Sequence, residues 1–161
     1  GLNWTQWENN FNKISQSGSV SSLHSMYTIS ALSLEGLPDF LDWCIKVKKN
    51  KGAKDGITFT LNILRFPNFQ SVLVLPQNLR HVFAERLKNW LDINGTSDLL
   101  HQMEVDHIER LIEYLENNNN QVANREQLVP YFKNYYKQYD KRRNKNLIQT
   151  FPIIGEWYNG L

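Results

Sequence analysis

Small hydroxyl and amide side chains recur at alternate positions in two stretches of the chain that favour β-strands. These side chains are Thr28, Ser30, Thr58, Thr60 and Asn62. Alternation places them on one side of each strand and the apolar residues on the other. If the two strands are neighbours and parallel, we expect the polar sides to face the interior of a partly open barrel. The alternative is that each hydroxyl bonds a nearby backbone group or faces water on a one-sided sheet.

The strands are predicted at residues 24–33, from β-branched content, and at residues 57–66, from alternation. Ligands of parallel sheets bind at the carboxyl ends of the strands, because loop amides and helix N-termini converge there. The residues that this rule places nearest to a site are Ser30, Ala31, Leu32, Ser33, Asn62, Leu64 and Arg65.

Apolar residues with helical spacing flank both strands. They predict a helix over residues 4–15 and another from Leu37 to about Lys49, so helix, strand, helix and strand follow one another. This order is typical of an α/β layer in which right-handed crossovers make the strands parallel. We expect one short strand in QSVLVLP, residues 70–76.

Everything after Pro76 has a helical period. Three helices are expected, the second opening at a Thr-Ser cap and the third at a capping box of Asn124 and Gln127. The tail is expected to pack as a clasp through Phe151, Ile153, Ile154 and Trp157. The predicted fold class is therefore α/β, with a partial (β/α) barrel of few parallel strands and crossover helices at residues 1–76. A helical C-terminal region at residues 77–161 packs on it.

Composition excludes several classes of protein. With 41% apolar and 12% aromatic residues the chain is not disordered, and 18 basic against 16 acidic residues indicate no charged partner. No apolar run is long enough to span a bilayer, so we expect a cytoplasmic protein with no membrane partner. The chain begins with Gly1 rather than Met, which we interpret as a cloning remnant on part of a longer protein.

Other residues that could do chemistry favour structural interpretations. His101 and His107 are six residues apart, His81 has only Glu85 beside it, and Cys44 is expected to be a small buried hydrophobe.

The basic and aromatic segment 133–145 could bind nucleic acid. A pair of Asp140 with an arginine that anchors the final helix is favoured instead, so nucleic acid is not the expected partner. Phosphate loops, nucleophile elbows and metalloprotease signatures do not occur in the sequence.

The order of several phrases resembles the later part of radical S-adenosylmethionine proteins of the twitch-domain type. The phrases are WTQWENNFNKI, TISALSLEGLPDFLDW, TLNILRFPNF, SVLVLPQNLR and YKQYDKRRNKNLIQTFP. The resemblance spans nearly the whole chain, and the order of the phrases is more specific than any one of them. It implies the closing strands of a partial (β/α)6 barrel, followed by a helical tail.

In that family S-adenosylmethionine lies across the carboxyl ends of the barrel strands, beside a 4Fe–4S cluster. The resemblance implies that Ser30, Ser33, Asn62 and Leu64 line the cofactor pocket. It implies in the same way that Thr28, Thr60 and Arg65 face the substrate, whose small-molecule or peptide nature is not indicated. Ser33 stands where Asn often follows Ser-Ala-Leu in the family.

The chain lacks the cysteine motif of the CxxxCxxC type that holds the cluster, and Cys44 is its one cysteine. The early motifs that bind the amino-acid end of the cofactor are also missing. We therefore expect a fragment of a radical enzyme, inactive alone, whose partner is the remainder of the parent barrel. The alternative is a non-enzymatic α/β interaction module that self-associates through exposed strand edges.

Overall fold

The computed structural model describes residues 3–17, 20–51 and 56–161. Its elements are α1 (Trp4–Gln16), β1 (Leu23–Ile29), α2 (Leu37–Lys51), β2 (Ile57–Ile63), the 3-10 turns η1 (Asn68–Gln70) and η2 (Val72–Val74), α3 (Gln77–Asn94), α4 (Gln102–Glu116), α5 (Arg125–Arg143), α6 (Leu147–Thr150) and α7 (Pro152–Asn159). The described part of the chain is thus α/β and mostly helical, with two strands. No helix within these ranges is both long and apolar enough to cross a lipid bilayer.

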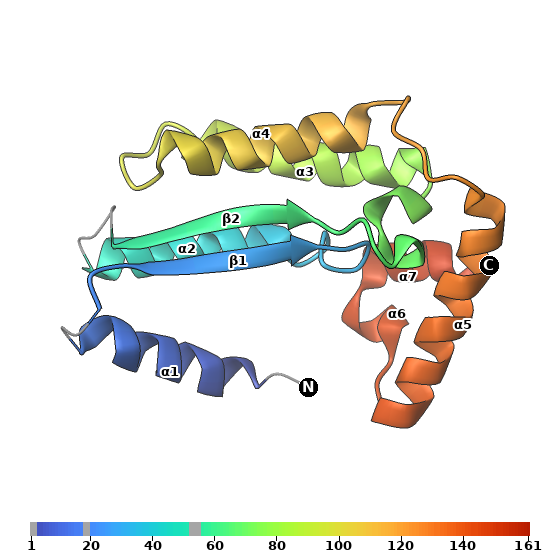
Figure 1. The fold of residues 1–161 in the computed structure, drawn as a ribbon, viewed down its shortest axis with the longest axis horizontal. Coiled ribbons are helices and arrows are strands. Elements are labelled where there is room, and N and C mark those ends of the chain that lie inside the picture. The colour runs from blue at the N-terminus through green and yellow to red at the C-terminus, as the bar shows by residue number, and fades with distance from the viewer. Residues whose placement is uncertain (1–2, 18–19, 52–55) are drawn as a thin grey trace.

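The two strands are parallel neighbours, as the order of elements predicts. Their register pairs Leu23 with Ile57 and Ile29 with Ile63. One face of the sheet carries fully buried residues, among them Ile29, Phe59 and Leu61. Figure 1 shows α2 running behind both strands, so α2 covers this apolar face as the crossover between them.

Helix α1 joins the domain through an aromatic cluster around Trp43 of α2. The rings of Trp7 and Phe11 each lie 5.0 Å from the Trp43 ring, centroid to centroid. Glu8 of α1 accepts a hydrogen bond of 3.0 Å from the indole nitrogen of Trp43. The spacing of aromatic residues in α1 therefore serves this contact.

Helices α3 and α4 form an antiparallel pair beside β2 (Figure 1). An ion pair links α4 to α2, because the Lys48 ammonium lies 2.5 Å from the Glu104 carboxylate and both side chains are fully buried. The sequence suggests burial of the Lys48 stem only. The charged end is buried as well, since Glu104 and the carbonyl oxygen of Leu99 both accept hydrogen bonds from it.

The C-terminal tail packs as the predicted clasp. Ile154 is fully buried, and Phe151, Ile153 and Trp157 contact the core. Glu35 fixes the start of α7, because its two carboxylate oxygens accept hydrogen bonds of 3.0 Å from the backbone amides of Ile153 and Ile154.

Three local predictions were wrong. Strand β1 ends at Ile29 and β2 at Ile63, because the chain turns where strand was expected to continue. The segment 70–76 forms a 3-10 turn and no strand. Asn124 precedes α5 in the left-handed conformation (φ 57°) and its side chain caps nothing, so the predicted capping box does not form.

Helix α4 begins at Gln102 rather than at the expected Thr-Ser cap. Glu104 explains the later start, because its carboxylate accepts a hydrogen bond of 2.9 Å from the backbone amide of His101.

Candidate functional site

The strands carry a second face, which we call the polar face. It consists of His24, Met26 and Thr28 of β1 and Thr58, Thr60 and Asn62 of β2. The parallel register brings these alternate residues to the same side, opposite the face that α2 covers. No helix lies in front of the strands in the view of Figure 1, and Thr28 and Asn62 are exposed.

His24 connects the two strands across the polar face. Its Nδ1 atom lies 2.8 Å from the Thr58 hydroxyl oxygen, and its Nε2 atom lies 3.0 Å from the Thr60 hydroxyl oxygen. The imidazole therefore orders both threonine hydroxyls. In a neutral imidazole one ring nitrogen donates and the other accepts, so that form would give the two hydroxyls opposite hydrogen-bonding roles.

Helix α4 forms a wall along the β2 side of this face. Arg110 donates hydrogen bonds of 3.0 Å to the carbonyl oxygen of Leu61 and 2.7 Å to Nδ1 of His107. Burial lowers the pKa of His107 and the charge of Arg110 lowers it further, while the charge of Asp106 partly opposes them. The wall thus holds a fixed cation beside an imidazole whose neutral form is favoured.

Ser30 and Ser33 lie past the end of β1, in the turn that leads to α2. The Ser33 hydroxyl accepts a hydrogen bond of 2.6 Å from the Ser30 amide and lies 3.0 Å from the carbonyl oxygen of Thr28, to which it donates. Tyr27 adds a hydrogen bond of 3.0 Å from its hydroxyl to the Ser33 carbonyl oxygen. The Ser33 hydroxyl is therefore used within this turn, as in the local alternative.

The other predicted residues lie at the carboxyl end of β2. Asn62 and Arg65 are exposed, and Leu64 is partly buried where its amide donates a hydrogen bond of 2.9 Å to the carbonyl oxygen of Ile29.

The structure therefore brings Thr28, Thr60 and Asn62 to one surface. Ser30, Ser33, Leu64 and Arg65 lie on the loops at its carboxyl edge.

The two outer edges of the sheet differ. The outer edge of β2 is covered by α4, because the Glu104 carboxylate accepts the Phe59 amide and Arg110 donates to the Leu61 carbonyl oxygen. Strand β1 pairs with β2 alone within the described residues, so its outer edge carries no strand. Pairing with a further strand is therefore open to β1 alone, and α1 lies on that side of the sheet (Figure 1).

The described residues do not form a metal centre. They contain no group of three or more histidine, cysteine, aspartate or glutamate side chains placed to hold a metal. Cys44 lies on α2, is 1% exposed, and has a pKa raised to about 12, mainly by burial. These properties match the expected buried hydrophobe and do not fit a ligand of an iron–sulfur cluster.

The basic segment near the end of α5 differs from its prediction. The Asp140 carboxylate accepts a hydrogen bond of 2.8 Å from the Leu147 amide, and the ion pairs of the described residues do not include it. Asp140 thus anchors the tail through the backbone rather than through an arginine. Arg143 lies over the Tyr139 ring at 5.9 Å.

His24 and Arg110 are the residues of this site that the sequence-based prediction missed. Alternation alone could have found His24, since it lies four residues before Thr28 and therefore on the same face of the strand. Arg110 offers no comparable signal, because its place beside β2 depends on how α4 packs.

Comparison of the chain with models of protein families, with curated proteins and with solved structures gives no match.

Proposed function

We propose that this chain is the carboxyl-terminal part of a radical S-adenosylmethionine enzyme, in which the polar face forms part of the wall of the cofactor and substrate pocket. The observation that carries the proposal is the parallel pairing of β1 and β2 with their hydroxyl and amide groups on one uncovered face. A parallel barrel needs such a sheet, with helices on its outside and ligand-binding groups at the carboxyl ends of its strands.

The unequal edges of the sheet agree with this role. Helix α4 closes the outer edge of β2, so a barrel could continue only from β1. Unpaired strand edges are unfavourable in an isolated domain and are normally paired or covered. In the proposed parent protein, strands that precede residue 1 pair with β1 and enclose the polar face.

The chain would supply only part of the chemistry. Thr60 and Asn62 offer the hydroxyl and amide groups that bind polar groups of a cofactor such as S-adenosylmethionine. The iron–sulfur cluster would supply the electron for reductive cleavage. Buried Cys44 does not suit a ligand of this cluster, so cysteines elsewhere in the parent protein would hold it. The chain alone is then not catalytic, and its loops at residues 30–36 and 64–67 form the rim of the pocket.

The test uses the whole native protein. Its reading frame is expected to encode a CxxxCxxC-type motif upstream, and the protein loaded with iron and sulfide is expected to bind S-adenosylmethionine. Asn62→Ala should weaken this binding roughly tenfold, the cost of one or two hydrogen bonds. Asn89→Ala, at an exposed position of α3, is the control and should leave it unchanged. A frame without the motif, or equal binding by both variants, would contradict the proposal.

The edge of β1, which pairs with no strand other than β2 within the described residues, also favours a second candidate function, a non-enzymatic module that binds a protein strand. Met26 on the polar face is 66% exposed, which suits a surface that is covered by another chain. In that case the isolated chain should self-associate. Light scattering that shows a single monomeric species over about a tenfold range of concentration would exclude this candidate.

A further inference from the structure

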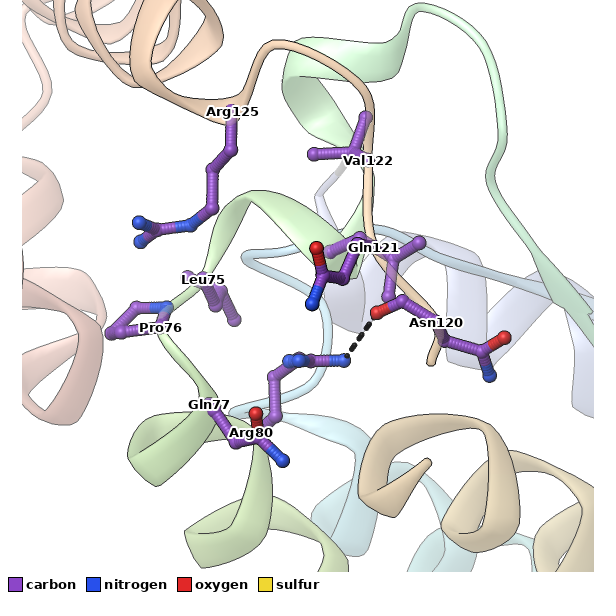
Figure 2. Close-up of a pocket in the computed structure, with 9 residues that line it drawn as sticks. Leu75, Pro76, Gln77, Arg80, Asn120, Gln121, Val122 and Arg125 are labelled. Carbon is purple, nitrogen blue, oxygen red and sulfur yellow. Dashed lines mark hydrogen bonds between the residues drawn. The ribbon is translucent and has the colours of Figure 1, made fainter. Parts of the chain in front are cut away.

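A cavity of about 300 Å³ lies between the start of α3 and the connection from α4 to α5. Its polar lining residues are Gln77, Arg80, Asn120, Gln121 and Arg125. Leu73, Leu75, Pro76 and Val122 supply its apolar wall. In Figure 2 the Arg80 side chain extends from α3 towards Asn120, and the Arg125 side chain descends from α5 towards Pro76; both residues line the cavity. None of these residues belongs to the polar face.

Arg80 is a buried cation with too few partners. The residue is 4% exposed, and its Nη1 atom donates a hydrogen bond of 3.1 Å to the carbonyl oxygen of Asn120. Its Nε atom is buried and has no hydrogen-bond partner among the described residues. A guanidinium has five N–H donors, and burying it without a counter-ion is costly. Carboxylates do not appear among the residues that line the cavity.

Arg125 brings a second positive charge to the same space. Its Nε atom donates a hydrogen bond of 3.0 Å to the carbonyl oxygen of Val74, which fixes the position of the side chain. Burial lowers the pKa of Arg80, and the charge of Arg125 lowers it further. Arginine side chains carry their positive charge at neutral pH. An anion bound in the cavity would offset this repulsion.

Two helices also point their positive ends at the cavity. Gln77 is the first residue of α3 and Arg125 the first residue of α5, and both line it. Neither helix has a side-chain cap; the Leu79 amide of α3 and the Gln127 amide of α5 instead donate hydrogen bonds to the carbonyl oxygens of Pro76 and Asn124. Helix N-termini carry partial positive charge and bind phosphate and carboxylate groups.

We propose that this cavity binds a phosphate-type oxyanion, either free phosphate or the phosphate group of a small phosphorylated molecule. Arg80 and Arg125 pair with its oxygens, and the amides at the starts of α3 and α5 complete the shell. Guanidinium groups suit this ligand because their paired N–H donors match two oxygens of one phosphate group. The apolar wall leaves room for the organic part of a phosphate ester. The proposal does not depend on the radical-enzyme role.

The test measures binding of inorganic phosphate by calorimetry, and the rise that it causes in the thermal unfolding midpoint, at ionic strength held constant with chloride. Phosphate should bind the folded chain and stabilise it. Arg125→Gln should weaken binding roughly tenfold or more, since it removes charge-assisted hydrogen bonds. Arg142→Gln, which removes the same charge at the exposed far end of α5, is the matched control and should bind as the unaltered chain does.

A second measurement needs no variant and covers the case in which Arg125→Gln does not fold. Phenylglyoxal modifies accessible arginines, and phosphate should slow its reaction at Arg125 but not at Arg142, as mapped by mass spectrometry. Glycerol phosphate that binds more tightly than phosphate would identify a phosphate ester as the ligand, and equal binding would identify free phosphate. Absence of phosphate binding, equal binding by the folded Arg125→Gln variant, or unprotected Arg125 would overturn the proposal.

Discussion

Among the charged residues of the described core, Glu104 links the largest number of segments through hydrogen bonds. Its carboxylate accepts hydrogen bonds from the Lys48 ammonium, from the Phe59 amide at 3.0 Å and from the His101 amide at 2.9 Å. One buried side chain therefore joins α2, β2 and the start of α4. It also satisfies an edge amide of β2 that would otherwise be buried without a partner.

Glu104→Gln should destabilise the chain by about 3 to 5 kcal/mol, because it leaves the Lys48 charge buried and uncompensated. Denaturant titration followed by circular dichroism measures the effect. Glu109→Gln, at an exposed position of the same helix, should change stability by less than about 0.5 kcal/mol. If the two variants were equally stable, the assignment of Glu104 as the central link would be wrong.

The Cys44 thiol should not react with disulfide reagents in the folded chain. Burial, with the nearby Glu104 charge, raises the pKa of its thiol to about 12, and only a thiolate attacks disulfide reagents. We expect no reaction with an aromatic disulfide reagent at about pH 8 in native buffer, and full reaction in guanidinium chloride. The chain has one cysteine, so the measured thiol count is unambiguous. Native and unfolded protein reacting at the same rate would contradict the burial.

His107 should make stability depend on pH in the weakly acidic range. Its pKa in the folded chain is lowered by burial and by Arg110, so the unfolded chain takes up the proton first as pH falls. The contribution of neutral His107 is complete above its ordinary pKa of about 6.5 and is lost as pH falls through the folded value.

His107→Gln removes this titration and keeps an acceptor for Arg110. The variant should therefore lose less stability than the unaltered chain between about pH 7.5 and pH 5.5, as measured by thermal unfolding. The same loss in both proteins would show that His107 does not contribute.

At the scale of elements, the C-terminal clasp depends on one long-range carboxylate. Glu35 is 9% exposed, and it holds the first turn of α7 through the Ile153 and Ile154 amides. Glu35→Ala should cost about 2 to 3 kcal/mol, the range for hydrogen bonds to a charged group, and should speed hydrogen exchange of α7. Glu156→Ala, on the exposed side of α7, is the control. Unchanged exchange in α7 would show that apolar packing alone holds the tail.

Periodicity predicted the elements better than it predicted their ends. Alternation identified β2, and aromatic spacing identified α1. The end of β1 escaped prediction because the Ser30–Ser33 turn is stabilised by its own hydroxyls, which compete with strand pairing. The Val72–Val74 run favours a strand by composition, yet it forms a 3-10 turn. Tertiary context overrides local preference there.

At the scale of the whole molecule, the parallel sheet with one polar face was predictable, because it follows from the alternation and from the order of helices and strands. The wall that α4 builds was not predictable. Glu104 and Arg110 lie 45 and 49 residues from the backbone groups that they bind in β2, and nothing in the local pattern connects them. The cavity between Arg80 and Arg125 depends in the same way on contacts distant in sequence.

The central claim is that the polar face is the inside of a larger pocket. Thr60→Cys tests it most directly, since Cys44 is buried and the new thiol would report access to that face. The rate of alkylation at position 60, followed by mass spectrometry of its peptide, is compared in the isolated chain and in the whole native protein with and without S-adenosylmethionine. We predict rapid labelling in the isolated chain and labelling in the native protein that the cofactor slows roughly tenfold, as expected for a covered site. Labelling that is equally fast in all three samples would contradict the account.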